Sequence, residues 1–391
     1  MASKAGEIRM QATVLDYRKL ARRRLSRLAF DYLDGGAEDG STLKRNTTVA
    51  SRVLFSPQIF NDVTDCDAST TLFNRTQSLP VLVGPTGLNG LFWPRGDEIL
   101  ATQAHRAGVP FVLSTASTST IEAVREASAG DLWLQLYVQQ DRRIAEDLMW
   151  RAQAAGYSSL MLTVDTPVHG KRDHDHRNRF KLPLQITPRM ALDFLLHPHW
   201  SWQMARSGGP QLVNLAQSTG IKANINVQAA ALSRKMDMAL SWDDVAWLRR
   251  HWEGPVLIKG ILSVDDAKLA RRHGLDGIVL SNHGGRQLPS VPSALELLPA
   301  VVDAVGASMD VLVDGGFRRG SDVVKAIAMG ASGVLLGRAP LYGLAASGGQ
   351  GVADVLEILR DEIEITMRLI GRSRLSQLDA SAVDCSRLQN W

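Results

Sequence analysis

Short apolar runs recur along the chain and predict eight buried β-strands. A run of four to eight apolar residues between turn or polar residues is typical of a strand in the middle of a parallel sheet. The runs lie at residues 81–84, 110–114, 132–136, 160–165, 256–259, 277–281, 311–314 and 333–337. Most are separated by patterns of helical length, at residues 97–107, 144–155, 264–273 and 321–329.

This alternation of strands and helices predicts a parallel α/β fold. Eight units predict a closed (β/α)8 barrel, a TIM barrel, formed by a single domain of residues 1–391. The runs end in polar residues, and in this barrel the active-site residues come from the carboxyl ends of the strands. A doubly wound open sheet with scattered polar caps is the alternative, which we consider less consistent with this pattern.

Two regions lie outside the repeating units. Residues 14–33 follow a helical pattern with six basic residues, interpreted as a solvated helix face, and two glycines then end the helix close to Tyr32. After strand four, residues 166–241 form an insertion far longer than the usual barrel loop. The insertion carries ten Lys or Arg residues against four Asp and no Glu.

Composition narrows the class of protein. With 391 residues, 45% of them apolar and 21% charged, the chain can bury a large core. A net charge of +4 is small for this length and argues against nucleic acid as a partner. Two cysteines offer neither a metal set nor a disulfide framework, so no metal is expected. We find no signal-peptide pattern and no apolar run long enough to cross a bilayer, and therefore expect a cytoplasmic location.

The loop that follows the sixth run places a histidine, which can act as a base, beside an arginine, which can bind an anion. Residues 281–287 read Ser-Asn-His-Gly-Gly-Arg-Gln, so His283 and Arg286 share one tight turn at a strand end. An arginine fork matches a carboxylate with two hydrogen bonds. The pair suggests proton abstraction from a small acid, although a structural histidine is the more frequent role for such a residue by itself.

A phosphate site and a buried lysine add to this chemistry. Asp314 to Ser321 leave strand seven and Gly337-Arg338 close strand eight, which are the usual phosphate positions in this barrel. Lys259 ends strand five and needs an anionic partner if it is buried. It could form a Schiff base or face the N1–O2 edge of a flavin, and the histidine–arginine loop favours the flavin.

With these motifs the chain resembles the FMN-dependent L-2-hydroxy-acid oxidases and dehydrogenases over nearly its whole length. The shared motifs lie at residues 32–39, 84–87, 114–117, 135–137, 163–165, 281–287 and 314–321. Residues 84–90, followed by Trp93-Pro94, are most similar to the mandelate dehydrogenases.

The resemblance implies a role for each matching position. His283 would be the base and Asp165 its hydrogen-bonded partner. The substrate would contact Tyr32, Tyr137, Arg172 and Arg286. FMN would lie on Pro85, Thr86 and Gly87, with Ser114, Gln135, Thr163, Lys259 and Ser281 around its ring. Its phosphate would lie on Gly316, Arg318, Gly337 and Arg338, and Asp314 would bind the ribityl chain. Gly315 and Phe317, in the same loop, would also contact the cofactor.

Two positions depart from the family pattern. Gln287-Leu288-Pro289 stands where many members have Gln-Leu-Asp, so an acid and a backbone donor are lost. Lys171 precedes Arg172 where we would expect a residue that lines the pocket. Both differences affect the expected substrate range.

The resemblance implies oxidation of an (S)-2-hydroxy acid, mandelate-like, to the 2-oxo acid by a homo-oligomer. Electrons would pass to a quinone or another membrane acceptor. The alternatives are an oxidase using dioxygen and a flavin-free phosphate-binding barrel enzyme.

Part of the insertion predicts contact with a membrane. Residues 190–204 are too short to span a bilayer, but they mix large apolar residues with tryptophans suited to its interface. Basic residues nearby would attract anionic lipid: Arg177, Arg179, Lys181, Arg189 and Arg206. We therefore expect a peripheral enzyme on the inner face of the cell membrane. An active-site lid or a subunit contact is the alternative role of this segment.

Overall fold

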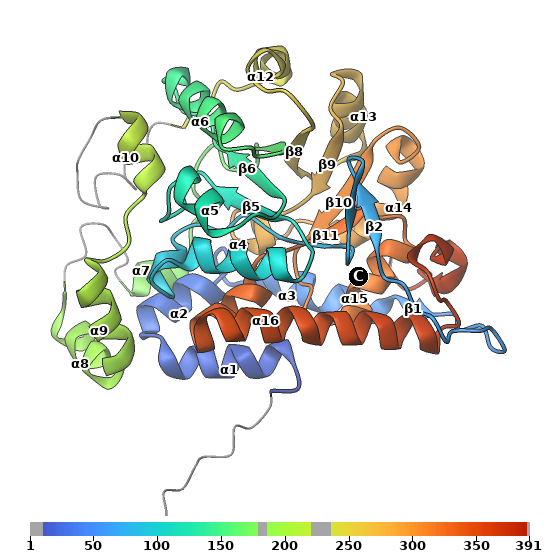
Figure 1. Cartoon of the computed structure of the whole chain (residues 1–391), viewed down its shortest axis with the longest axis horizontal. Helices are drawn as coiled ribbons and strands as arrows, with labels where there is room; N and C mark the ends of the chain where they lie inside the picture. The colour runs from blue at the N-terminus through green and yellow to red at the C-terminus, as the bar shows by residue number, and fades with distance from the viewer. Residues whose placement is uncertain (1–10, 179–185, 220–235, 389–391) are drawn as a thin grey trace, which may run out of the picture.

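The eight predicted runs form a closed barrel of parallel strands. A computed structural model describes residues 11–178, 186–219 and 236–388, and its strand order is β10-β11-β4-β5-β6-β7-β8-β9 (Figure 1). The strands are β4 Val81–Val83, β5 Phe111–Ser114, β6 Leu132–Leu136, β7 Ser159–Thr163, β8 Val256–Ile261, β9 Gly277–Leu280, β10 Asp310–Asp314 and β11 Gly333–Leu336. Pairing of Val334 with Val81 closes the ring. The predicted (β/α)8 barrel is confirmed.

Helices follow the strands and cover the outside of the barrel. They are α4 Gly96–Arg106, α5 Ile121–Ala127, α6 Arg142–Ala154, α13 Val264–Arg272, α14 Ala294–Val305, α15 Gly320–Ala328 and α16 Arg338–Leu369. Local sequence sets several of their starts. The Ser263 hydroxyl accepts the amide of Asp266 at the start of α13, and Ser293 and Glu296 form a capping box at the start of α14.

The amino-terminal pattern at residues 14–33 is two helices, not one. Helix α1 covers Val14–Arg24 and α2 covers Arg27–Asp34, so the continuous helical pattern was wrong at the junction. Leu25 is extended, and Ser26 caps α2 by accepting the amide of Ala29. Helix α1 lies along α16 (Figure 1). Arg18 pairs with Asp34 at 2.6 Å, so the basic face is not wholly solvated.

The segment between β7 and β8 contains the predicted insertion. Its described helices are α7 Asp173–Arg177, α8 Pro188–Leu196, α9 Pro198–Ser207, α10 Val213–Thr219, η3 Trp242–Asp244 and α12 Val245–His251. The predicted membrane segment at residues 190–204 is a pair of helices, because Pro198 ends one and begins the next. Arg179 and Lys181 lie outside the described residues. Helices α8 and α9 lie beside α1 and α2 (Figure 1).

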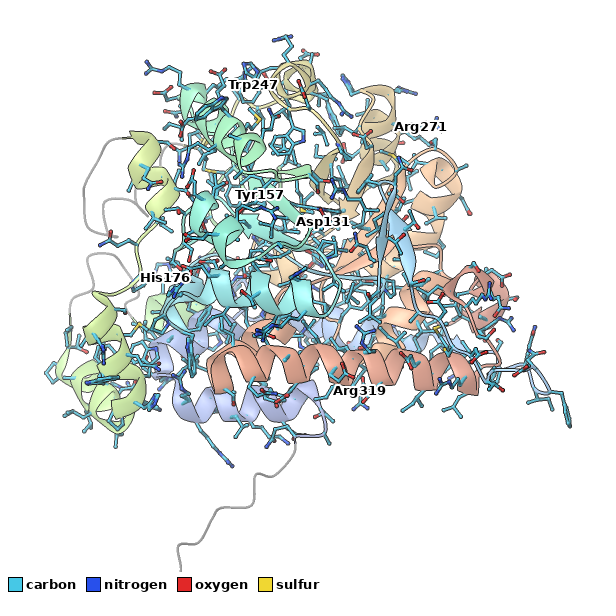
Figure 2. The ribbon with its side chains drawn as sticks, in the orientation of Figure 1. Asp131, Tyr157, His176, Trp247, Arg271 and Arg319 are labelled. Atoms are coloured by element: carbon cyan, nitrogen blue, oxygen red, sulfur yellow. The ribbon has the colours of Figure 1, made fainter. Side chains whose placement is uncertain are left out.

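A small hairpin closes the amino-terminal end of the barrel. Strands β2 Thr70–Leu72 and β3 Arg75–Gln77 bring Leu72 and Phe73 against the inner layer of barrel side chains. This layer contains Leu82, Val112, Trp133, Met161, Leu257, Val279, Leu312 and Leu335. Asp131 (Figure 2) holds this end together, because it accepts the indole N–H of Trp133 and the hydroxyl of Ser158.

The remaining elements are short or peripheral. They are α3 Ser41–Thr48, η1 Val49–Arg52, β1 Leu54–Phe55, η2 Asn89–Leu91, η4 His283–Gly285, η5 Leu375–Gln377, η6 Ala380–Ala382 and β12 Val383–Asp384. Among the described residues, no helix combines the length and apolarity that crossing a bilayer requires.

Candidate active site

A cavity of about 600 Å³ opens at the carboxyl ends of the barrel strands. It is lined by seventeen of the residues predicted for the site: Tyr32, Pro85, Thr86, Gly87, Ser114, Tyr137, Arg172, Lys259, His283, Arg286, Asp314, Gly315, Gly316, Phe317, Arg318, Gly337 and Arg338. The other four predicted residues, Gln135, Thr163, Asp165 and Ser281, do not line the cavity. Gln135, Asp165 and Ser281 bond to lining residues, and Thr163 bonds to Gln135. Sequence motifs separated by about 300 residues therefore meet at one site.

His283 is held in a strained loop with one ring nitrogen fixed. Its backbone φ is 57°, in the left-handed region that non-glycine residues rarely adopt and that is frequent at functional sites. Its Nδ1 lies 2.9 Å from Oδ1 of Asp165, and its Nε2 lies 3.5 Å from the Tyr137 hydroxyl. A carboxylate at Nδ1 favours the tautomer with the proton on that nitrogen. Nε2 is then free to accept a proton.

Asp165 remains ionised although it is buried. Burial by itself would raise the pKa of this carboxyl group, but its interactions with His283 and Lys259 bring the pKa below its ordinary value. The Asp165 side chain packs against the backbone of Gly260, whose φ is 114°. A Cβ atom at residue 260 would lie 2.6 Å from the Asp165 side chain, so a glycine is needed there. Asp165 can therefore stabilise an imidazolium at position 283.

Two arginines and a tyrosine form an anion site beside the histidine. The guanidinium groups of Arg172 and Arg286 lie 5.4 Å and 5.1 Å from the centre of the Tyr32 ring. Burial lowers the pKa of Arg286 to about 9, and the neighbouring positive charges of Arg172 and Arg338 contribute to this shift. A bound carboxylate would relieve this concentration of positive charge.

The loop that carries Arg286 and Pro289 is held by contacts from three other parts of the chain. The amide of Gly170 donates to the Gln287 side chain at 2.6 Å, and the hydroxyl of Thr42 donates to the carbonyl of Leu288 at 3.2 Å. Arg286 itself donates to the carbonyl of Gly35 at 3.0 Å. These contacts come from the insertion, α3 and α2, so they do not depend on the missing acid.

Lys259 is buried within a network of acids. Its Nζ lies 2.8 Å from the Ser281 hydroxyl and 3.1 Å from Asp314 Oδ2. Burial by itself would lower the pKa of Lys259, but the carboxylates of Asp314 and Asp165 raise it above its ordinary value. A lysine held in its charged form is a poor Schiff-base nucleophile, so its geometry suits an electrostatic role.

A chain of hydrogen bonds orients the polar groups behind the cavity. The Gln135 amide donates to the Thr163 hydroxyl and accepts from the Ser114 hydroxyl, both at 3.0 Å. Elsewhere in the cavity lining, Oδ1 of Asp314 is buried without a hydrogen-bond partner among the described residues. An unsatisfied buried oxygen of this kind calls for a ligand hydroxyl or a water molecule.

The expected phosphate end combines glycines with two arginines. Gly316 has φ 92°, and a Cβ atom there would lie 1.9 Å from the carbonyl oxygen of Asn46, so only glycine fits. Arg318 lies 5.4 Å from the centre of the Tyr342 ring. Arg338 donates to three backbone carbonyl groups, those of Leu33, Gly284 and Gly35. It thus ties α2 to the His283 loop, and only part of its donor set remains for a phosphate.

Comparison with known proteins identifies this arrangement. The sequence profile of the FMN-dependent dehydrogenases matches residues 21–385. The chain belongs to this family.

Relatives in this family cover nearly the whole chain. The chain is 46% identical to an (S)-mandelate dehydrogenase of Pseudomonas putida over 365 residues, 93% of this chain and 92% of that protein. It is 43% identical to an L-lactate dehydrogenase of Acinetobacter baumannii, over 95% of this chain and 96% of that protein. The crystal structure of a monotopic membrane protein, (S)-mandelate dehydrogenase, superposes with a TM-score of 0.93 at 45% identity, covering 96% of this chain and 100% of that one.

The chain is therefore an FMN-dependent 2-hydroxy-acid dehydrogenase resembling the mandelate enzymes, and its cofactor is FMN. This excludes the flavin-free barrel. The cavity fits the cofactor: the orphaned Asp314 oxygen can accept a ribityl hydroxyl, charged Lys259 can face the ring, and the glycines at 315 and 316 leave room for a phosphate. FMN-dependent dehydrogenases use this flavin as the acceptor of the two electrons released by the substrate.

The cavity also includes residues that the motifs did not indicate. Among them are Phe92, Thr166, His169, Asp175 and Leu212. Arg172 pairs with Asp175 at 3.1 Å, which orients its guanidinium. Phe92 stacks on Tyr32 with ring centres 6.2 Å apart. The i,i+3 spacing of Arg172 and Asp175 could have indicated this ion pair from the sequence. The position of His169 could not be predicted in this way, because it depends on how the insertion folds back.

Proposed function

We propose that this dehydrogenase oxidises an (S)-2-hydroxy acid of the mandelate type to the 2-oxo acid. The observation that carries the proposal is the joint position of His283, Arg172 and Arg286 around one cavity, with the histidine oriented by a carboxylate. Mandelate is favoured over lactate by the 46% identity to a mandelate dehydrogenase and by apolar walls at Leu88, Phe92 and Leu212. A small aliphatic acid would leave those walls uncovered.

The residues imply one orientation of the substrate. Arg172 and Arg286 bind the carboxylate, and Tyr32 lies between their guanidinium groups as a further donor. The 2-hydroxyl group then faces His283 Nε2 and the Tyr137 hydroxyl, which are 3.5 Å apart. Burial raises the pKa of Tyr137 to about 12, so its hydroxyl stays protonated and can donate.

His283 removes a proton in this arrangement. The substrate loses two electrons and two protons in becoming the 2-oxo acid. Nε2 would take one of the protons, either from the hydroxyl group or from Cα, and the two electrons and the second proton would pass to bound FMN. The positive charge that forms on the ring is stabilised by Asp165, 2.9 Å from Nδ1. General-base catalysis of this kind contributes about 10²–10⁴-fold to a rate.

Replacing the base tests the assignment. His283→Asn should retain FMN and lower the rate of anaerobic flavin reduction by (S)-mandelate by about 10²–10⁴-fold. His176→Asn is the matched control, because His176 is exposed on α7 and does not line the cavity (Figure 2). Reduction of His283→Asn at the wild-type rate would contradict the role of His283. Failure of the wild type to oxidise mandelate would contradict the substrate.

We further propose that the enzyme attaches to the inner face of the cell membrane and passes electrons to a quinone. Leu192, Leu195 and Leu196 project from one side of α8 and are 59%, 76% and 70% exposed, and Trp202 on α9 is 59% exposed. We call these four side chains the α8–α9 surface. Arg206 lies 5.2 Å from the Trp202 ring, which adds positive charge at this surface. The similar (S)-mandelate dehydrogenase of known structure is a monotopic membrane protein, which supports the proposal.

The α8–α9 surface can be removed without disturbing the packing beneath it. Each large apolar side chain that leaves water contributes about 1.5–3 kcal/mol, so changing all four residues to serine or glutamine should lower affinity for anionic vesicles more than ~100-fold. Activity with a soluble dye should persist. Trp150→Gln, at a tryptophan that is 68% exposed on α6, is the control for loss of a surface aromatic residue. Equal vesicle binding by the wild type and the fourfold variant would refute membrane attachment through this surface.

The identity of the acceptor has its own test. Substrate-reduced enzyme should be reoxidised faster by a short-chain quinone than by dioxygen at equal concentration. Faster reoxidation by dioxygen would replace the dehydrogenase proposal with the oxidase alternative. We also propose that the enzyme is a homo-oligomer, which light scattering after gel filtration would check.

A further inference from the structure

One part of the cavity wall is assigned neither to FMN nor to the reacting groups of the substrate. Once the carboxylate lies on the two arginines and the hydroxyl group faces His283, the side chain on C2 must face the remaining wall. The lining residues available to this side chain include Leu88, Phe92, Thr166, His169 and Leu212. Three of these side chains are apolar, as expected for an aromatic group. The polar pair, Thr166 and His169, is not explained by unsubstituted mandelate.

His169 is held in place at the rim of the cavity. The amide of Gly170 donates to the Gln287 side chain at 2.6 Å, and the carbonyl of Lys171 accepts the amide of Glu38 at 2.8 Å. A Cβ atom on Gly170 would lie only 2.3 Å from the carbonyl oxygen of Gln287, so this backbone is packed tightly. The position of the imidazole at the cavity is therefore set by the loop that carries Arg286.

His169 is exposed at the rim of the cavity, where the nitrogens of its imidazole are available to a ligand. Within the described parts of the chain, neither ring nitrogen makes a hydrogen bond or an ion pair. Desolvation lowers the pKa of His169, and the positive charges of Arg172 and His283 lower it further. The ring is thus neutral at pH 7, with one donor and one acceptor nitrogen.

Thr166 provides a second, independent observation. Its side chain is 95% removed from solvent, and Oγ1 makes no hydrogen bond of ordinary geometry among the described residues, although the Tyr137 hydroxyl is near enough for Thr166 to lower the pKa of that group. Thr166 lines the same cavity as His169. A buried hydroxyl group without a partner is uncommon and indicates a ligand or a water molecule at that point.

Resting on the proposed function, we propose that His169 and Thr166 recognise an uncharged hydrogen-bonding group on the substrate side chain. The substrate class would be ring-hydroxylated aromatic 2-hydroxy acids. An uncharged group is favoured because a cationic side chain would meet Arg172, and because the substrate carboxylate already occupies the two arginines that could bind a second anion. A phenolic hydroxyl group can both donate to and accept from a neutral imidazole.

The test compares hydroxyl with methyl substituents of nearly equal size. For the wild type, kcat/KM is measured with 3- and 4-hydroxymandelate and with 3- and 4-methylmandelate. The ratio of hydroxyl to methyl at the preferred ring position isolates the hydrogen bond from shape. We expect this ratio to be about three- to tenfold in favour of the hydroxyl compound, the usual net effect of one hydrogen bond. His169→Leu should bring the ratio close to one.

His176→Leu is the matched control, because His176 is an exposed histidine seven residues further on that does not line the cavity, and its ratio should equal that of the wild type (Figure 2). A ratio near one in the wild type, or an unchanged ratio in His169→Leu, would overturn the inference while leaving mandelate oxidation in place. Absence of turnover with every mandelate derivative would instead overturn the proposed function.

Discussion

Trp200 should couple the α8–α9 helix pair to the wall of the active site. Its side chain is only 5% exposed, and its indole N–H donates to the carbonyl of Leu91 at 2.8 Å. The next residue, Phe92, lines the cavity and stacks on Tyr32. On the other side of this contact, Arg24 lies 3.9 Å from the centre of the Trp93 ring. The packing that holds the helix pair in place is therefore one residue away from the substrate site.

The size of the effect follows from these contacts. Trp200→Phe removes one hydrogen bond and leaves the Leu91 carbonyl unsatisfied, a loss of about 1–3 kcal/mol. Trp200→Ala also removes the buried ring, for about 3–5 kcal/mol. Because α9 is peripheral, this loss should release the helix pair locally and leave the barrel folded. The KM for mandelate should rise by at least ~10-fold in Trp200→Ala, and FMN content should not change.

Trp202 provides a matched control two residues away. It is 59% exposed, so Trp202→Ala should weaken vesicle binding and leave the KM measured with a soluble dye unchanged. Trp200→Ala should instead speed amide exchange at Leu91 and Phe92, whose N–H groups bond within their own turn. Equal kinetic effects of the two variants, or unaltered exchange at Leu91 and Phe92, would refute the coupling.

Three further predictions concern the cavity. Arg286→Lys keeps a basic group but loses the planar fork, so the affinity for mandelate and the rate of flavin reduction should both fall. Arg172→Met should weaken binding of mandelate more than binding of its methyl ester. Equal losses for acid and ester would make Arg172 structural. Gly87→Ala places a methyl group 3.0 Å from the Cβ atom of Ala116, so the ratio of reoxidation by dioxygen to reoxidation by dye should change, and a constant ratio would leave Gly87 with a packing role alone. The pKa of Asp165 is lowered in the folded state, so its contribution to stability is present above its unfolded pKa and is lost as pH falls through the folded value. The difference in urea stability between the wild type and Asp165→Asn should therefore shrink below about pH 4. A difference that grows with acidity would contradict this role of Asp165.

The barrel and its mouth could be predicted because both depend on local signals. Residues 132–136 are apolar except for Gln135, a pattern expected of a strand buried on both faces, and the observed β6 has the same limits. Residues at the ends of such strands necessarily meet at one face of a closed barrel. This is why His283 and Lys259, far apart in sequence, could be assigned to one site.

Features set by tertiary packing could not be predicted in this way. The break between α1 and α2 depends on a serine cap inside a pattern that otherwise continues. The division of residues 190–204 between exposed and buried positions depends on Trp200 meeting Leu91, a contact across 109 residues. His169 belongs to the cavity only because Gly170 packs on Gln287, which no spacing in the sequence indicates.

The hairpin of β2 and β3 has a kinetic consequence. Leu72 and Phe73 seal the opposite end of the barrel, and the cavity lies at the carboxyl ends of the strands. We expect hydroxy acid, oxo acid and electron acceptor to use the mouth at that end in turn, so that the oxo acid departs before a bulky acceptor comes close. Double-reciprocal plots at several acceptor concentrations should accordingly be parallel lines, the signature of a ping-pong enzyme.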